Sequence, residues 1–160
     1  MARFKDVLLL VGQLNYTWTN TESLLIHMIA GLAGVDKETA IVIFLTLNTP
    51  RARIDLVERL AKMQRIEAGC RADVLEATQR LSEEAKLRNK YNHCIYSFDE
   101  AGEIGLTQSL RIFESKDAIK YGKVEALDDT EVAKINNSIR SLVSINRSFW
   151  DITVHYGFPQ

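Results

Sequence analysis

The sequence predicts a mainly α-helical protein, an up-and-down helical bundle with a small β-hairpin or meander inserted before the C-terminal helix. Two observations lead to this fold class. Apolar residues recur at three- and four-residue steps over most of the chain, which is the period of amphipathic helices. Between about residues 97 and 127 the period changes to two, as in Ile104, Leu106, Leu110 and Ile112, which is typical of half-buried strands.

The N-terminal half contains three predicted helices. The first covers residues 4–32 and ends at Gly34, which suits a left-handed cap. Asp36 is a good N-cap for a short second helix, DKETAIVIFLTL, which is apolar on most sides and is therefore expected to be buried. Thr49 as N-cap and Pro50 at the first helical position begin the third helix.

A fourth helix is predicted from about Ala68 to about Tyr96, before the β segment. The closing helix follows Asp128, which forms a capping-box pattern with Glu131 three residues later. The sequence shows no repeat or linker, and residues 1–160 are expected to form a single domain.

Composition limits the possible functions. The 160 residues are 46% hydrophobic and 26% charged, as in soluble globular proteins, and the net charge is −1. Any contact with RNA or DNA therefore requires a local basic patch. The two cysteines, Cys70 and Cys94, offer neither a disulfide framework nor a CxxC pair for a metal, so we expect no cofactor and no metal site. No stretch suggests a signal peptide or a membrane span, and a cytoplasmic location is expected.

Polar residues interrupt the apolar stripes of two predicted helices. At about 100° per residue, Arg88 falls in the middle of the apolar stripe of the fourth helix, together with Asn92. Asn89, His93 and Tyr96 form an adjoining polar line. An arginine that faces a protein core must be paired or must line a functional cleft, because an unpaired buried charge is costly.

Two interpretations of these polar residues are open. In the structural one, Glu22, which lies on the apolar stripe of the first helix, pairs with Arg88 or Arg53 and fixes how the helices dock. In the functional one, Arg88 neutralises a phosphate, His93 transfers a proton and Asn89 orients an oxygen atom. These are the groups that RNA cleavage without a metal requires.

The hexapeptide RNKYNH, residues 88–93, resembles the Arg-Asn-x-x-x-His form of the motif of the HEPN superfamily. The resemblance implies a homodimeric helical bundle whose motif helices meet across a two-fold axis, and a metal-independent endoribonuclease activity. It assigns Arg88 to the phosphate charge, His93 to general acid and base catalysis, and Asn89 to holding the geometry. A growth-arresting toxin or defence effector, with an antitoxin or other regulatory partner, is the implied cellular role.

One position departs from the superfamily pattern. Toxins paired with a nucleotidyltransferase antitoxin often carry a tyrosine two residues after the histidine, where this chain has Ile95 and only then Tyr96. There are two alternatives to a ribonuclease. The first is a non-catalytic interaction or nucleotide-binding module of the same superfamily, in which the polar cleft fixes how the two protomers of the dimer align. The second is an unrelated helical bundle held together by internal salt bridges. RNA contacts would come from the basic third helix or from the hairpin region, where Phe113 and Tyr121 alternate with basic residues.

Overall fold

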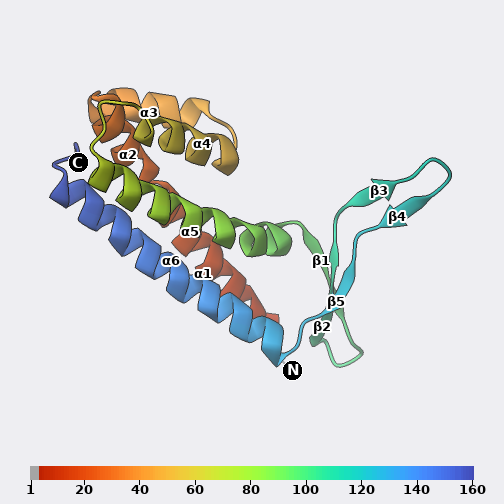
Figure 1. The fold of residues 1–160 in the computed structure, drawn as a ribbon. Helices are drawn as coiled ribbons and strands as arrows, with labels where there is room; N and C mark the ends of the chain where they lie inside the picture. Colours follow the sequence, from red (N-terminus) through yellow and green to blue (C-terminus); the bar gives the residue numbers. More distant parts are fainter. Residues whose placement is uncertain (1–3) are drawn as a thin grey trace. The chain divides into compact units, whose positions relative to one another are not determined.

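A computed structural model describes residues 4–160 and confirms the predicted fold class (Figure 1). The protein is mainly helical, and antiparallel strands precede the last helix. The helices are α1 (Phe4–Glu22), α2 (Leu25–Ala33), α3 (Lys37–Thr46), α4 (Pro50–Ala61), α5 (Ala68–Asn92) and α6 (Asp129–His155). The strands are β1 (Cys94–Phe98), β2 (Ile104–Ser109), β3 (Ile112–Glu114), β4 (Ile119–Tyr121) and β5 (Val124–Ala126).

The chain forms two compact units. The strand-containing unit consists of residues up to 16 together with residues 86–140, and the helical unit consists of residues 17–85 and 141–160. The long helices α1, α5 and α6 each contribute residues to both units.

The first predicted helix is divided in two in the structure. The hydrogen-bond pattern tightens at its break, where the Leu24 amide donates to the Thr21 carbonyl at 3.1 Å. The hydroxyl of Ser23 donates to the Asn20 carbonyl at 2.8 Å, and so it competes with the backbone amides that would otherwise bond to the carbonyl oxygens of α1. The prediction of one continuous helix to residue 32 was therefore wrong, although Gly34 does end α2 in the left-handed conformation, with φ 69°.

Both predicted N-caps in this region are confirmed. The Asp36 carboxylate accepts from the Thr39 amide at 2.7 Å, and the Thr49 hydroxyl accepts from the Ala52 amide at 3.1 Å. The expected burial of α3 was wrong, since only Ala40 and Phe44 are buried. Only one face of this short helix packs, so apolar side chains on its other faces remain exposed.

The core of the helical unit contains an ion pair whose carboxylate, that of Glu22, is buried and whose guanidinium, that of Arg53, is partly buried. Its apolar part includes Trp18, Leu25, Met28, Ile29, Leu32, Val57, Leu81, Leu142, Ile145 and Phe149. Glu22 accepts from the guanidinium of Arg53 at 2.5 Å and from the indole nitrogen of Trp18 at 2.6 Å. Arg53 also donates to the carbonyl oxygens of Phe44 and Leu47, at 3.1 and 3.0 Å. Of the two partners that the sequence left open for Glu22, the structure therefore selects Arg53.

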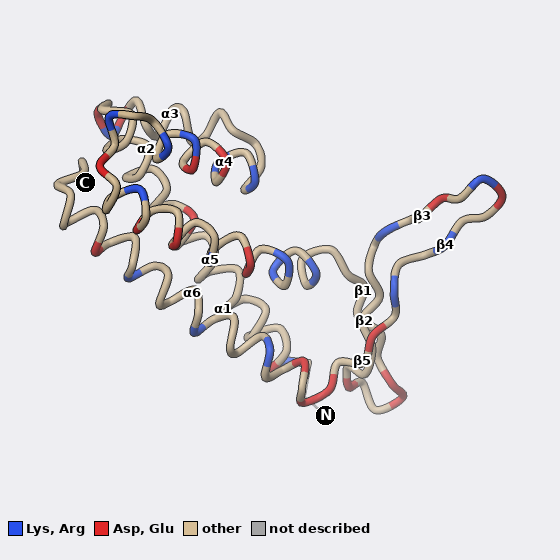
Figure 2. Tube along the Cα trace, in the orientation of Figure 1, with Lys and Arg blue, Asp and Glu red and all other residues tan. Residues whose placement is uncertain are grey.

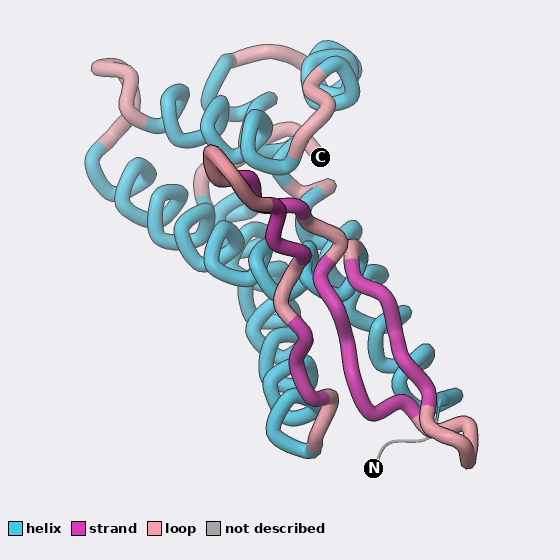
Figure 3. Tube along the Cα trace, turned by 90° about the vertical axis from the view of Figure 1, so that its right-hand side faces the viewer, coloured by secondary structure: helices cyan, strands magenta, loops and turns pink. Residues whose placement is uncertain are grey.

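In the strand-containing unit, β1, β2 and β5 form an antiparallel sheet with β2 in the middle, and β3 and β4 form a separate hairpin (Figure 3). The helix predicted to reach Tyr96 ends at Asn92 instead, and β1 begins at Cys94. β-branched and aromatic residues in this stretch pair with β2, with Tyr96 opposite Thr107. Tyr96 therefore does not belong to the helical polar line of Asn89 and His93.

The start of α6 is capped as predicted, but Glu131 has a different role from the one expected. The Asp128 carboxylate accepts from the Glu131 amide at 2.9 Å. The side chain of Glu131 accepts from Lys90 and Tyr91, both at 2.8 Å, and from Lys134 at 2.5 Å. Burial raises the pKa of Glu131, but these hydrogen bonds outweigh burial and lower it to about 2.

Glu131→Gln is expected to lower stability in a pH-dependent way. Because the folded-state pKa lies below the usual 4.5, the carboxylate stabilises the fold fully above about pH 5 and loses this effect as the pH falls toward 2. We expect a loss of about 2 kcal/mol at pH 7, less than the full shift implies because Lys134 is exposed, and almost none near pH 2. Urea unfolding at both pH values measures this, with Glu114→Gln on the exposed hairpin as control. Equal losses at the two pH values would contradict it.

Candidate functional site

The last turns of α5 present one polar face. Lys86, Asn89, Lys90 and His93 follow one another at positions i, i+3, i+4 and i+7, which places them on the same side of the helix. His93 comes directly after the helix end, and its amide donates to the Asn89 carbonyl at 3.1 Å. Its carbonyl accepts from the Leu110 amide at 2.9 Å. His93 is therefore held at both backbone groups, between the end of α5 and the start of the hairpin.

A cleft of about 610 Å³ opens along this face. It is lined by Lys86, Asn89, Lys90, His93, Ser109, Leu110 and Arg111. Two of the three site residues predicted from the sequence, Asn89 and His93, therefore line one cleft. No acidic residue is among the lining side chains.

The charges in the cleft favour an anion. The Lys90 ammonium is neutralised by Glu125 at 2.9 Å and Glu131 at 2.8 Å. Burial lowers the pKa of Lys90, but the two carboxylates outweigh burial and raise it. Lys86 and Arg111 form no salt bridge with another residue in the range 4–160. Their positive charges remain for a ligand such as a phosphodiester.

The third predicted residue, Arg88, does not line the cleft. Its guanidinium donates to the Asn89 side-chain oxygen at 3.2 Å. In the amide orientation that satisfies its neighbours, the Asn92 oxygen accepts from Arg88 Nε at 3.0 Å, and the Asn92 nitrogen donates to Asn15 Oδ1 at 2.9 Å. Asn89 thus connects the cleft to a polar network of Arg88, Asn92 and Asn15.

Part of the cleft was not predicted from the sequence. The spacing of Lys86, Asn89, Lys90 and His93 is a helical face, and that signal would have added both lysines to the site. Arg111 is one of several basic residues in the hairpin region, and its sequence position alone does not distinguish it from the others. Its place in the cleft depends on the pairing of β1 with β2, which puts Cys94 opposite Ser109 and brings the start of the hairpin to His93.

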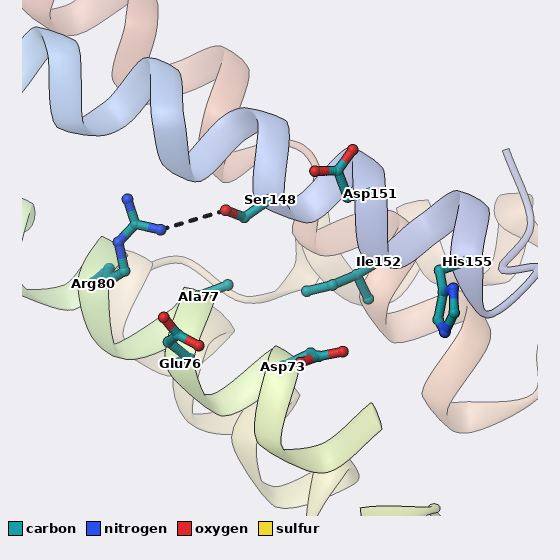
Figure 4. A pocket seen from close by; sticks show the side chains of 8 residues that line it. All are labelled: Asp73, Glu76, Ala77, Arg80, Ser148, Asp151, Ile152 and His155. Carbon is teal, nitrogen blue, oxygen red and sulfur yellow. Dashed lines mark hydrogen bonds between the residues drawn. The ribbon is translucent and has the colours of Figure 1, made fainter. Parts of the chain in front are cut away.

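The helical unit has a second cavity, of about 390 Å³, between α5 and α6 (Figure 4). Asp73, Glu76, Ala77, Arg80, Ser148, Asp151, Ile152 and His155 line it. Arg80 donates to Ser148 at 3.3 Å and to Ser144 at 2.9 Å. Asp73 accepts from the hydroxyl of Tyr156 at 2.7 Å, which raises the pKa of Tyr156 to about 12. Three carboxylates beside one arginine disfavour an anionic ligand in this cavity.

Two further findings concern residues 4–160. No helix in this range has both the length and the apolar character needed to cross a bilayer. No three histidine, cysteine, aspartate or glutamate side chains in the same range are grouped so that they could hold a metal ion.

The chemistry available in the cleft is that of cations, an imidazole and an amide. These groups suit phosphate binding and proton transfer. Comparison of the chain with models of known families, with curated proteins and with solved structures gave no match.

Proposed function

We propose that the protein is a metal-independent endoribonuclease that acts as a homodimer. The observation that carries this proposal is the cleft in which Asn89 and His93 lie with Lys86 and Arg111 and without a lining carboxylate. The resemblance of residues 88–93 to the Arg-Asn-x-x-x-His motif of the HEPN superfamily supports the same activity.

In the proposed reaction, the ribose 2′-hydroxyl attacks the adjacent phosphorus. His93 takes the hydroxyl proton, the new O2′–P bond forms, and the P–O5′ bond breaks. The leaving 5′-oxygen takes a proton from a protonated histidine or from water. Arg88 stabilises the charge on the phosphoryl oxygens, and Asn89 orients the phosphate or the guanidinium. The products carry a 2′,3′-cyclic phosphate and a 5′-hydroxyl.

A dimer would bring Arg88 to the reacting phosphate. Arg88 and His93 project about 140° apart along a helix, and only His93 lines the cleft. On α1, Leu8, Leu9 and Tyr16 are 53%, 64% and 71% exposed, and they form an apolar face with Gly12 near its middle. Asn15, which belongs to the Arg88 network, lies at the border of that face. In the proposed dimer a second copy covers this face, and Arg88 of one protomer acts in the cleft of the other.

The direct test is incubation of the protein with a mixed single-stranded RNA pool in EDTA. We expect cleavage that leaves 5′-hydroxyl and 2′,3′-cyclic phosphate ends, detected by kinase labelling and mass spectrometry. DNA of the same sequence and 2′-O-methyl RNA are expected to remain intact, because both lack the attacking hydroxyl. Cleavage of DNA, loss of activity in EDTA, or no cleavage of RNA would each overturn the proposal.

A second candidate is a non-catalytic interaction or nucleotide-binding module. The hydrogen bonds between Arg88, Asn92 and Asn15 favour it, because they give Arg88 a structural role that needs no substrate. In this case RNA or a nucleotide binds without being cut, and Arg88→Ala mainly lowers the melting temperature. Cleavage by the wild type excludes this candidate.

A further inference from the structure

The β3–β4 hairpin has two chemically different faces. Opposed residues of an antiparallel pair share a face, and here Phe113 is opposite Lys120 whereas Ile112 is opposite Tyr121. All residues from 110 to 121 are exposed. Figure 2 shows Lys and Arg residues along the hairpin strands and at the tip. One face therefore combines an aromatic ring with positive charge, and the other is mostly apolar.

The aromatic and basic face adjoins the His93 cleft. A smaller hollow of about 170 Å³ is lined by residues that include Phe113 and Lys123. Lys90, Ser109 and Arg111 line both this hollow and the His93 cleft. The two hollows therefore share a wall, and a ligand can extend from one to the other past Arg111.

The charge along this path is positive. Lys86 and Arg111 have no carboxylate partner in residues 4–160. Glu125 lines the smaller hollow but is neutralised by Lys90 at 2.9 Å and Lys123 at 3.2 Å. The hydrogen bond from Lys90 is the main cause that lowers the pKa of Glu125.

Backbone hydrogen bonds fix the root of the β3–β4 hairpin next to His93. The Leu110 amide donates to the His93 carbonyl, and the Ser109 amide donates to the Lys123 carbonyl at 3.1 Å. Gly122 is buried at this crossing, where a Cβ atom would overlap the Ser109 carbonyl oxygen. The root of the hairpin is thus held closely against the end of the site.

From this geometry we propose that the hairpin carries a nucleobase-stacking subsite. The Phe113 ring stacks on an unpaired base near the scissile bond, and Arg111 contacts the phosphate between that base and His93. This inference rests on the proposed ribonuclease function. It defines the substrate of that ribonuclease as an RNA strand with unpaired bases, because both faces of a base inside a duplex are already stacked. Phe113 is 54% exposed, so its ring is available for stacking.

The test is a binding measurement that does not depend on cleavage. A fluorescein-labelled single-stranded RNA 12-mer is titrated, in EDTA, with His93→Ala protein and followed by fluorescence anisotropy. Adding Phe113→Ala is expected to weaken binding about 10-fold, and Phe113→Trp is expected to preserve it. Tyr121→Ala, an aromatic replacement on the opposite face, is the matched control and is expected to change binding less than about 2-fold. Circular dichroism checks that each variant is folded.

Other outcomes overturn the subsite or separate it from the proposed function. Equal effects of Phe113→Ala and Tyr121→Ala, or a larger effect of Tyr121→Ala, would overturn the subsite, as would equal binding of duplex RNA that also depends on Phe113. Binding that depends on Phe113, with no cleavage by the wild type, supports the subsite and rejects the ribonuclease. Cleavage by the wild type, with binding indifferent to Phe113, supports the ribonuclease and rejects the subsite.

Discussion

His93→Ala is expected to reduce RNA cleavage by about 10²- to 10⁴-fold, which is the usual contribution of a general acid or base. The melting temperature is expected to stay close to that of the wild type, because the side chain of His93 is exposed. Initial cleavage rates on one labelled RNA, with melting curves of the same samples, measure this. His155→Ala replaces another exposed histidine, outside the cleft, and is expected to retain full activity. A His93→Ala protein that cuts at the wild-type rate rejects the assignment.

Arg88→Ala tests whether the site is shared between protomers. The single variant is expected to lose activity as His93→Ala does, because the charge on the phosphate is no longer stabilised. Co-expression of Arg88→Ala and His93→Ala chains with different tags yields a heterodimer with one intact composite site. That heterodimer is expected to regain about half of the wild-type activity, since a two-fold dimer has two equivalent sites. A site built within one protomer would leave it inactive.

The second large effect concerns stability. Arg53→Ala is expected to lower the free energy of unfolding by about 3 kcal/mol, because within residues 4–160 it leaves the buried Glu22 carboxylate with the Trp18 indole as its one hydrogen-bond donor. It also removes the cation that lies 4.0 Å from the centroid of the Phe44 ring. Urea unfolding followed by circular dichroism measures this loss.

Arg51→Ala provides the control. Its side chain is 92% exposed and lies 3.9 Å from Asp55, so its loss is expected to cost less than about 0.5 kcal/mol. The double change Glu22→Leu with Arg53→Met, which removes both charges and keeps apolar volume, is expected to recover part of the lost stability. Equal losses for Arg51→Ala and Arg53→Ala would show that the pair of Glu22 and Arg53 stabilises the fold no more than an exposed pair does.

Local sequence signals predicted the caps of the helices well. Asp36, Thr49, Gly34 and Asp128 act through bonds to residues a few positions away, and each was found in its predicted role. The helix boundary at residue 93 depends on a longer-range interaction. Tyr96 continues a helical pattern, but pairing with Thr107 gives it a place in a sheet, and spacing alone does not reveal that partner.

The candidate site could likewise be predicted only in part, because local spacing reveals residues that are close in sequence but not those that strand pairing brings together. Asn89 and His93 are four positions apart in the sequence, about one helical turn, and the structure brings them into one cleft. Arg111 is far from them in sequence, and its contribution arises from the β1–β2 pairing. The pairing of Glu22 with Arg53 likewise joins residues from two different helices, α1 and α4, which a helical wheel of α1 alone leaves undecided.

The way in which the β3–β4 hairpin joins the sheet also determines which part of the sequence can change without disturbing the fold. Its two ends leave and rejoin the sheet at Ser109 and Lys123, which are joined by a backbone hydrogen bond. A segment with adjacent ends can change in length or sequence at little entropic cost to the rest of the fold. Residues 110–121 can therefore change in sequence while Gly122, the end of α5 and His93 stay the same, and in the proposed ribonuclease such changes would alter substrate preference.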